Sequence, residues 1–450
     1  MMHSIFHEHP CLKQAAHLLN QLNPDQFEVY FQRYQRTKID SKDQQIDSLS
    51  KSEDVGLAIR LIQDRRMGFS FTTSLEREAI ARAVQTAFEI SHHMPQDPFV
   101  GLHSVSSAVY PAVDNWDQTG VQVPLSEKIR LAKSLEAYCR QADSRITAVR
   151  SASISESCIE THLLDSSGEH IHHQSTSYTA SVTCKAESEG ESQTGSEFAF
   201  SNYLDSLPLQ SVGESAARWA VELLGAKSAP TMKCPALLRN SVVADLVDFL
   251  SESFSAEQID KGRSLLAGKL GQPIFAESVH LIDDGLLAGG MGTMPFDGEG
   301  VPSKKTHLVS GGFLSGLLYD CYYARKNNTQ PTGCAVRGIK APPSIGVSNL
   351  YLQGGKKPPE ALVSDISKGI LITDFMGLHT ANPVTGDFSL GASGILIENG
   401  KLSTPVRGFA VAGNVLDVFR RITDLGNDLK FFGRIGAPTI RLSEISVGGV

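Results

Sequence analysis

Residues 10–22 place apolar side chains at helical spacing behind a proline, which is tolerated at the first position of a helix. Residues 27–71 change to an alternation of apolar and polar positions, which predicts antiparallel strands. A second helix is predicted over residues 73–92, opened by a capping signature in the run Thr73-Ser74-Leu-Glu-Arg-Glu and ended near His92 and His93. The first hundred residues therefore predict a mixture of strands and helices.

The middle of the chain repeats this mixture. Residues 95–124 are rich in Pro, Asp, Gly and Ser and are predicted to be a linker. A helix capped by Ser126 is expected to run to Cys139. Strands are expected over residues 146–200, and a helix over residues 212–224 that Gly225 ends. We place the domain boundaries accordingly, with an N-terminal α/β subdomain at residues 1–97, a helix-plus-strands middle region at 98–229 and a β-rich C-terminal domain at 230–450.

The C-terminal part begins with a predicted helix over residues 241–254 and continues mostly as short strands with Gly-rich turns. Its clearest local signal is the pair Asn399-Gly400 between two strand-like runs, which predicts a type I′ hairpin turn. A short helix is predicted over residues 415–422, with Asn414 as its N-cap. The expected fold is α+β, a mixed strand/helix N-terminal region followed by a mainly antiparallel β-rich C-terminal domain.

Composition and charge exclude several classes of protein. The 450 residues hold 41 Lys and Arg against 49 Asp and Glu, and a net charge of −8 argues against a general nucleic-acid binder. The 7 cysteines are scattered without a CxxC pair, which indicates a reduced protein without a disulfide framework or a thiolate zinc site. The chain has no signal-peptide pattern and no run of about 18 apolar residues, so we expect a cytoplasmic protein with no membrane contact.

Two polar groups are candidates for metal binding. His170 and His172 share one face of a predicted strand, but a metal site needs more ligands than this pair, so a solvated strand is the favoured interpretation. Asp245, Asp248 and Glu252 share one face of the helix predicted over residues 241–254. Carboxylates in this arrangement can hold Mg²⁺ or Ca²⁺, but a complete apolar face lies opposite them. That pattern is typical of the solvent side of an amphipathic helix.

Common catalytic motifs are absent from the sequence. There is no GxSxG elbow and no Walker-A loop, and the run at residues 289–292 lacks the third glycine and the helix start of a dinucleotide-binding motif. The segment Asp297-Gly298-Glu299-Gly300 is interpreted as a tight turn rather than an ion-binding loop. No catalytic residue is therefore assigned from local motifs.

Several short segments of the C-terminal half are weak signals singly but specific in their order and spacing. They are Asp283-Asp284-Gly285, PFDGEG at 295–300, GDFSLGASG at 386–394, IENGK at 397–401, Pro405-Val406, AGN at 412–414, GNDL at 426–429 and VGG at 447–449. With these segments the chain resembles the TldD/PmbA group of peptidase-related proteins, the so-called modulators of DNA gyrase. The N-terminal pattern of strands and then a helix also fits, so the resemblance covers nearly the whole chain.

The resemblance implies one of two branches. The TldD branch looks like a zinc peptidase with HExxxH on a helix and a cysteine near the C-terminus. The PmbA branch, also called TldE, lacks these ligands and pairs with TldD. Residues 261–272 resemble the segment that follows HExxxH, and carrying this register back without gaps puts the motif on residues 247–252.

In that register the two histidine positions become Val247 and Glu252, and the glutamate position becomes Asp248. The cysteine position falls near Gly436. A slip of a residue or so does not restore the motif, because no histidine occurs between His173 and His280. Val247 cannot donate a lone pair to zinc, so the resemblance implies the PmbA/TldE branch.

By this resemblance the chain should be a subunit, non-catalytic by itself, of a cytosolic TldD/TldE-type metallopeptidase complex that acts in proteolysis and maturation of unfolded peptides. Zinc is expected in the TldD-type partner, and no cofactor, metal ligand or catalytic residue is expected in this chain. In isolation the chain could form a homodimer. Two alternatives stay open, an autonomous hydrolase with non-zinc chemistry and a protein-binding regulator of the gyrase-modulator type.

Overall fold

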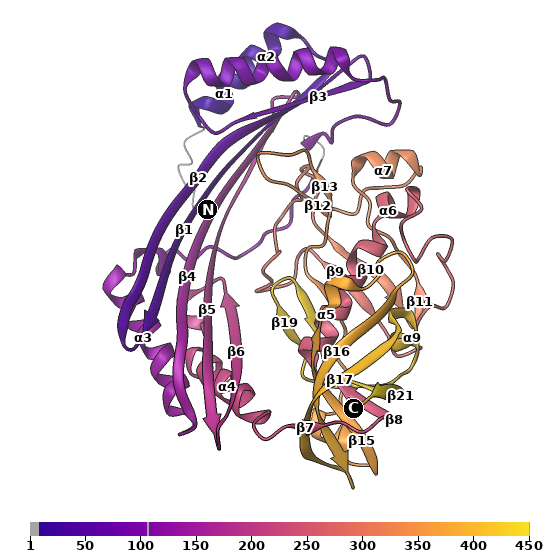
Figure 1. The fold of residues 1–450 in the computed structure, drawn as a ribbon. Helices are drawn as coiled ribbons and strands as arrows, with labels where there is room; N and C mark the ends of the chain where they lie inside the picture. Colours follow the sequence, from indigo (N-terminus) through magenta and orange to yellow (C-terminus); the bar gives the residue numbers. More distant parts are fainter. Residues whose placement is uncertain (1–8, 106–107, 450) are drawn as a thin grey trace.

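The computed structural model describes residues 9–105 and 108–449, which form a long curved sheet and a β-rich domain that lies within its curve (Figure 1). The curved sheet has the strand order β3-β2-β1-β4-β5-β6, and all neighbouring strands in it are antiparallel. Its strands are β1 Gln26–Lys42, β2 Gln45–Gln63, β3 Arg66–Thr72, β4 Ile146–Asp165, β5 His170–Ser188 and β6 Glu191–Ser201. The sheet runs across the boundary that we expect at residues 97/98.

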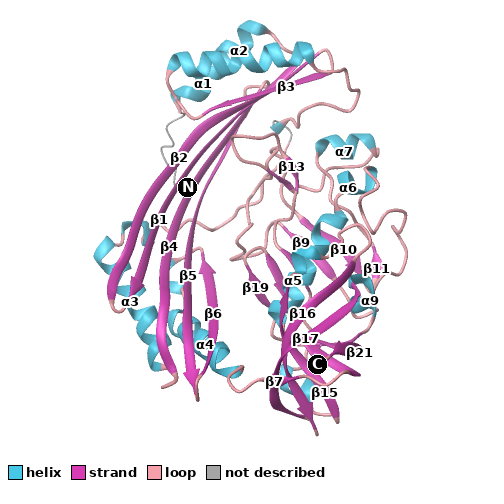
Figure 2. Cartoon of the chain, in the orientation of Figure 1, coloured by secondary structure: helices cyan, strands magenta, loops and turns pink. Residues whose placement is uncertain are grey.

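Two pairs of helices cover the outer face of this sheet, one pair near each end (Figure 2). They are α1 Pro10–Leu22 with α2 Arg77–His93, and α3 Leu125–Gln141 with α4 Leu209–Glu222. Alternate residues of a strand point to opposite faces, so Val29 and Phe31 of β1 pack beneath α1 and α2 while Tyr30 packs toward the C-terminal domain. The C-terminal domain therefore closes the inner face.

The C-terminal domain contains two larger sheets, ordered β18-β21-β8-β15-β16-β17-β7 and β11-β10-β9-β14-β20-β19, and the small pair β12-β13. Most neighbours are antiparallel, with parallel pairings β8–β15, β14–β20 and β7–β17. The strands of the larger sheet are β7 Lys227–Ser228, β8 Met232–Leu238, β15 Lys368–Met376, β16 Asp387–Glu398, β17 Lys401–Asn414, β18 Ile422–Leu425 and β21 Ile440–Gly448.

The remaining strands are short. They are β9 Leu281–Asp284, β10 Lys305–Ser310, β11 Phe313–Leu314, β12 Ala335–Val336, β13 Ser344–Ile345, β14 Leu350–Leu352, β19 Lys430–Phe432 and β20 Ile435–Ala437. The helices of this domain are α5 Asn240–Ser251, α6 Ala256–Asp260, α7 Cys321–Lys326, α8 Pro359–Val363 and α9 Val415–Arg420. Helix α5 contacts β15 of one sheet and β14, β19 and β20 of the other, and one apolar core encloses it.

The predicted α+β fold is confirmed, as are the strands over residues 27–71 and the helix over residues 10–22. The hairpin turn is also confirmed, because Asn399 and Gly400 have φ values of 52° and 74°, as a type I′ turn requires. Asn414 caps α9 as predicted, its side-chain oxygen accepting from the N–H of Leu416 at 3.0 Å.

Two predicted helix caps are wrong. Helix α2 begins at Arg77 without a side-chain cap, since the side chains of Thr72 and Ser74 instead accept backbone N–H groups two residues ahead of them in a local turn. Helix α3 begins at Leu125, so Ser126 lies inside its first turn. Among the described residues, no helix combines the length and the apolar character needed to cross a membrane.

Candidate functional site

Helix α5 is the element on which the sequence places the counterpart of a zinc motif. Strand β8 ends at Leu238, and the N–H of Arg239 donates to the carbonyl of Ile372 on β15 at 3.0 Å before the helix starts. The helix then buries an apolar face of Val242, Val243, Ala244, Leu246, Val247 and Leu250. This face holds α5 between the two C-terminal sheets and fixes which residues can point outward.

The structure separates the three positions of the predicted motif. Val247 is 0 % exposed and lies in the core, whereas Asp248 and Glu252 are exposed to solvent. Asp245 is exposed as well, so the solvent face predicted for Asp245, Asp248 and Glu252 is confirmed. Glu252 follows the last residue of α5 and borders a small hollow of about 100 Å³. A side chain at position 247 therefore points away from the exposed carboxylates.

Gly436 lies on β20, which runs beside α5. A Cβ atom at this position would lie 2.7 Å from the ring of Phe431 and 2.9 Å from the Cβ of Tyr351. These distances are below van der Waals contact, so any larger residue here needs the two aromatic side chains to move. The structure thus brings the strand of Gly436 next to the helix of Val247, but it leaves no space for a cysteine side chain.

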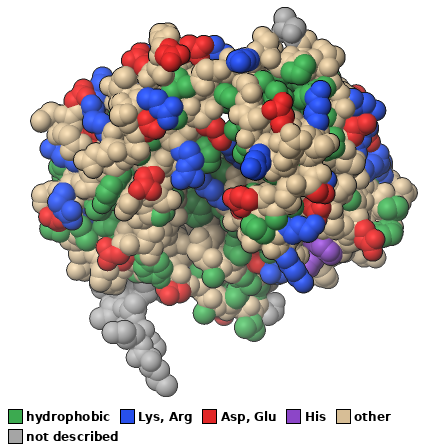
Figure 3. Space-filling model, turned by 90° about the horizontal axis from the view of Figure 1, so that it is seen from below, with side chains coloured by type: hydrophobic (Ala, Val, Ile, Leu, Met, Phe, Trp, Pro, Cys, Tyr) green, Lys and Arg blue, Asp and Glu red, His purple; other side chains and the backbone are tan. Residues whose placement is uncertain are grey.

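A cleft of about 990 Å³ opens at the other end of α5, between the curved sheet and the C-terminal domain. Figure 3 views the protein from below and shows a hollow between the two halves with charged and apolar side chains around it. The cleft is lined by residues of β6, α4, β15 and β19 and by Arg239, Asn240 and Ser241 at the start of α5. Val247, Asp248, Glu252 and Gly436 do not line it.

Charged and aromatic side chains join the two walls of the cleft. Arg239 donates to both carboxylate oxygens of Glu222 at 2.6 and 2.7 Å, and its guanidinium lies 4.3 Å from the ring centroid of Trp219. Lys430 donates to Glu197 at 2.6 Å, and the indole N–H of Trp219 donates to the same carboxylate at 3.2 Å. These contacts hold Trp219 as a rigid aromatic surface in the cleft.

The floor of the cleft includes an interrupted strand edge. Pairing of β15 with β8 ends at Ile372, because β8 turns into α5 there. Thr373 and Asp374 follow on β15 and line the cleft. Thr373 is 7 % exposed, and its buried hydroxyl has no hydrogen-bond partner among residues 9–105 and 108–449.

Three carboxylates lie close together beside this floor, on α5 and β15. Asp245 keeps an exposed side chain, but the surrounding protein removes enough water to raise its pKa to about 6, and the charges of Asp374 and Asp248 add to this effect. Loss of water likewise raises the pKa of Asp248. Repulsion among the three side chains therefore grows as the pH rises.

Replacing Asp245 by Asn should change the pH dependence of stability. The folded protein binds the Asp245 proton more tightly than the unfolded chain, in which aspartate titrates near about 3.9. The stabilisation that the folded protein gains from this proton is fully present below that pH, and it is lost as the pH rises through about 6. As the pH rises between these values, the free energy of unfolding of D245N should therefore increase relative to that of the unchanged protein. The change should be less than about 1 kcal/mol because the group is exposed. Urea denaturation at a series of pH values measures this, and a difference that does not vary with pH would contradict it.

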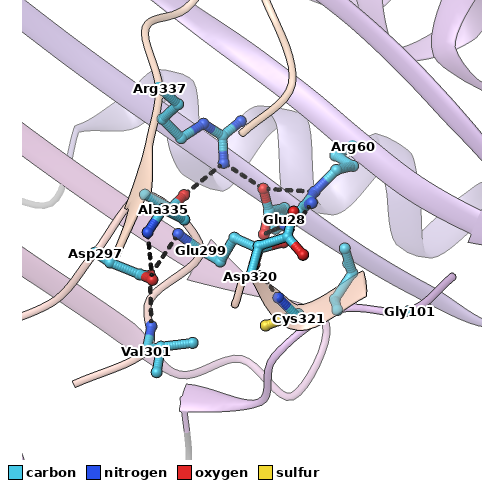
Figure 4. Close-up of polar contacts among 12 residues, drawn as sticks. Glu28, Arg60, Gly101, Asp297, Glu299, Val301, Asp320, Cys321, Ala335 and Arg337 are labelled. Carbon is cyan, nitrogen blue, oxygen red and sulfur yellow. Dashed lines mark hydrogen bonds and ion pairs between the residues drawn. The ribbon is translucent and has the colours of Figure 1, made fainter. Parts of the chain in front are cut away.

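A second group of carboxylates lies buried where the curved sheet meets the C-terminal domain (Figure 4). Arg60 of β2 donates to both oxygens of Glu28 at 3.0 and 2.9 Å and to Glu299 at 2.9 Å. Arg337 also donates to Glu28, and its guanidinium lies 4.2 Å from the ring centroid of Tyr30. The segment of residues 297–300 forms the predicted tight turn, with Gly300 at φ 79°, but its Glu299 belongs to an ion network that the sequence did not indicate.

Asp297 of the same turn has an unusual pKa. Burial raises the pKa to about 7, with repulsion from Glu299 adding, although hydrogen bonds from backbone N–H groups oppose this. Its two oxygens accept from the N–H groups of Glu299, Val301 and Ala335 at 2.8 to 3.0 Å. Perturbed carboxylates often mark active sites. Here the backbone occupies both oxygens, so we assign Asp297 to holding the turn and not to chemistry.

The histidines of the predicted strand have cross-strand neighbours. His172 is exposed, as expected for a solvated strand, but His170 is half-buried, with Nε2 only 2.9 Å from Nδ1 of His162 on β4. Sequence reasoning missed His162 and His9, both of which lie within hydrogen-bond distance of Glu160. The alternation of Glu160 and His162 on one strand face was the available signal.

Comparison with known proteins finds matches to this chain over most of its length. Family models for the PmbA/TldA metallopeptidase match domain 1 at residues 27–91, the central domain at 120–224 and the C-terminal domain at 231–449. The metalloprotease PmbA of Escherichia coli O157:H7 is 27% identical over 406 residues, which cover 90% of this chain and 88% of that protein.

Two solved structures share the fold over nearly the full length. A candidate modulator of a DNA gyrase from Thermotoga maritima has a TM-score of 0.88 and 25% sequence identity, covering 97% of this chain and 99% of its own. TldE from Thermococcus kodakarensis has a TM-score of 0.88 and 22% identity, covering 98% of this chain and 100% of its own, which shows likeness of fold alone.

Proposed function

This chain belongs to the PmbA/TldD metallopeptidase family, and from that membership we propose that it is a PmbA/TldE-like subunit of a TldD/TldE-type assembly. In this proposal the chain is not catalytic by itself. It works in the cytoplasm with a TldD-type partner that holds zinc, and the assembly cleaves or matures unfolded peptides. We also propose the domain boundaries at residues 97/98 and 229/230.

The side chains at the zinc-motif positions of helix α5 are the observation that supports this proposal. Zinc-dependent peptide hydrolysis needs nitrogen, sulfur or oxygen ligands that hold the ion and an activated water. The residues on α5 do not fit a zinc ion, because Val247 is apolar and buried while Asp248 and Glu252 point to solvent. Over residues 9–105 and 108–449, the one set of three potential ligand atoms that converges comes from β4 and the residue before α1, and not from α5.

The cleft supports a role in holding peptide. An extended peptide can add to a strand edge, with its backbone groups pairing along the edge. The part of β15 beyond Ile372 has no β8 partner, and Thr373 and Asp374 in this part line the cleft. Trp219, held by Arg239, offers an aromatic surface in the same cleft. We propose that an unfolded peptide lies in this cleft.

Reconstitution with a TldD-type partner tests the proposal. We expect no cleavage of an unstructured, fluorescently labelled peptide by the isolated chain and zinc-dependent cleavage by the mixture. A chelator should abolish the cleavage, and so should replacement of the glutamate in the partner's HExxxH motif. If the partner is equally active without this chain, or if the isolated chain cleaves the peptide in the presence of chelator, the proposal fails.

A cleft variant in the same experiment separates peptide binding from assembly. Trp219→Ala should raise the KM of the reconstituted assembly about ten-fold or more, since tryptophans commonly dominate binding surfaces. Trp219→Phe is the matched control, because it keeps an aromatic surface under Arg239 and loses only the indole N–H. Size-exclusion chromatography should show that both variants still assemble. An unchanged KM in W219A would remove the cleft from the proposal.

A further inference from the structure

A cluster of histidines and one glutamate lies on the outer face of the curved sheet, and the proposed function makes no use of it. Glu160 and His162 are two residues apart on β4, so both point to the face that α1 and α2 cover. His9 comes directly before α1, and its ring stacks on Phe31 of β1 at a centroid distance of 4.3 Å. His162 is 1 % exposed, while His9 and Glu160 keep limited access to solvent.

Three potential ligand atoms converge in this cluster. Nε2 of His9 and Nε2 of His162 each lie 3.0 Å from Oε1 of Glu160, and all three atoms lie within 4.8 Å of one another. Ligand atoms at about 2.1 Å from a tetrahedral zinc ion are about 3.4 Å apart. Binding of zinc would lengthen the two nitrogen–oxygen distances by about 0.4 Å, and rotation of the side chains would bring the two nitrogens, which lie within 4.8 Å of each other, to a similar separation.

The surroundings already orient the three side chains. Nδ1 of His162 lies 2.9 Å from Nε2 of His170, so the other ring nitrogen of His162 is directed at Glu160. Arg33 donates to Oε2 of Glu160 at 3.4 Å, which leaves Oε1 for the two histidines. Metal-binding histidines and carboxylates usually have such outer partners, which fix the tautomer and the ring orientation.

We infer that His9, Glu160 and His162 form a binding site for a divalent transition-metal ion, with Zn²⁺ as the best match. Two imidazoles and one carboxylate are a ligand set typical of zinc, and a water molecule would take the fourth position on the side where His9 and Glu160 are accessible. The ion would tie the start of α1 to β4, two segments that are 151 residues apart along the chain. This site is separate from α5 and does not depend on the proposed function.

Charge and hydrogen bonding allow one other explanation for the same distances. Without an ion, both Nε2 atoms can carry protons and donate to Glu160, and the charge of Arg33 would favour that arrangement over a nearby cation. Arg33 is also paired with Glu53 at 3.2 Å, which offsets part of its charge. Only the metal-binding arrangement predicts tight uptake of zinc that depends on these three residues.

Zinc binding by the full chain without an affinity tag tests the inference. The protein is stripped with chelator and dialysed against Zn²⁺, and bound metal is measured by mass spectrometry, with a chromophoric chelator as competitor for the Kd. Cobalt(II) in place of zinc should give the visible absorption of a tetrahedral site. We expect one zinc per chain, and His9→Gln and Glu160→Gln should each weaken binding about 100-fold or more, beyond the loss usual for an outer partner.

Two controls keep the result specific. His17→Gln changes an exposed histidine of α1, and a double variant His3→Gln, His7→Gln removes the other histidines near the N-terminus. Both should keep the zinc affinity of the unchanged chain, and circular dichroism should show that every variant is folded. The inference is overturned if the unchanged chain takes up no zinc in excess metal, or if either folded variant, H9Q or E160Q, binds zinc as tightly as before.

Discussion

Replacing Arg60 by alanine should reduce the free energy of unfolding by about 3–5 kcal/mol, because it leaves buried carboxylates without their counter-ion. The side chains of Arg60, Glu28 and Glu299 are 6 %, 1 % and 4 % exposed, so water cannot take over the lost contacts. Glu28 keeps Arg337, whereas Glu299 loses its guanidinium partner and keeps the N–H of Cys321 at 2.7 Å. Urea denaturation of R60A against the unchanged protein measures the loss.

Two further variants show whether the buried charge is the cause. Arg145→Ala removes an exposed arginine that pairs with Asp143, and it should cost no more than about 1 kcal/mol. Adding Glu299→Gln to R60A removes the charge left unpaired, so the double variant should be less destabilised than the sum of the single variants by about 0.5–3 kcal/mol. A loss in R60A no larger than in R145A would contradict a network that joins the curved sheet to the C-terminal domain.

Placing the HExxxH residues of the zinc motif on α5 should destabilise the protein and should not create a peptidase. The triple variant Val247→His, Asp248→Glu, Glu252→His should lose about 2–5 kcal/mol, the sum of an overpacked core and an unpaired imidazole. Val247 is fully buried, so a histidine at this position would point into the core. Urea denaturation, zinc analysis and a peptide-cleavage assay measure the outcome.

The matched control keeps the two exposed changes and leaves the core unaltered. Asp248→Glu with Glu252→His should change stability by no more than about 0.5 kcal/mol, since both side chains are at the surface. The zinc analysis is made in a Glu160→Gln background, so that metal on the curved sheet is not counted. A triple variant that is as stable as this control and binds zinc on α5 would show that position 247 can turn outward.

Local patterns predicted local elements well and long-range contacts poorly. The run from Thr73 to Glu78 matched a capping signature, but the hydroxyl of Ser74 accepts from the backbone N–H of Glu76 in a turn that precedes α2, because hydroxyl side chains can satisfy backbone groups in either setting. The tight turn at residues 297–300 was predicted from its glycines. Its pairing with Arg60, 239 positions away, had no local signal.

The cluster of His9, Glu160 and His162 is likewise a long-range contact that local patterns did not predict. His170 and His172 were recognisable as one face of a strand, and as a pair they carried no metal site. Glu160 and His162 share a face in the same way, but their meeting with His9 depends on the register of β4 with β1 and on the position of α1. A strand pattern determines which side chains share a face, and it does not say which other segment arrives at that face.

By itself the sequence determined the identities of the elements, the hairpin at Asn399-Gly400 and the family, and it determined that Val247 offers zinc no lone pair. The elements and the hairpin depend on neighbours within a few residues, the family depends on the order and spacing of short segments along the chain, and the missing lone pair depends on the side chain of Val247 alone. Only the tertiary structure decided that one sheet joins residues on both sides of position 97, that Val247 points inward and that His9, Glu160 and His162 converge. These outcomes depend on strand register and on packing between segments far apart in the chain, which local periodicity does not encode.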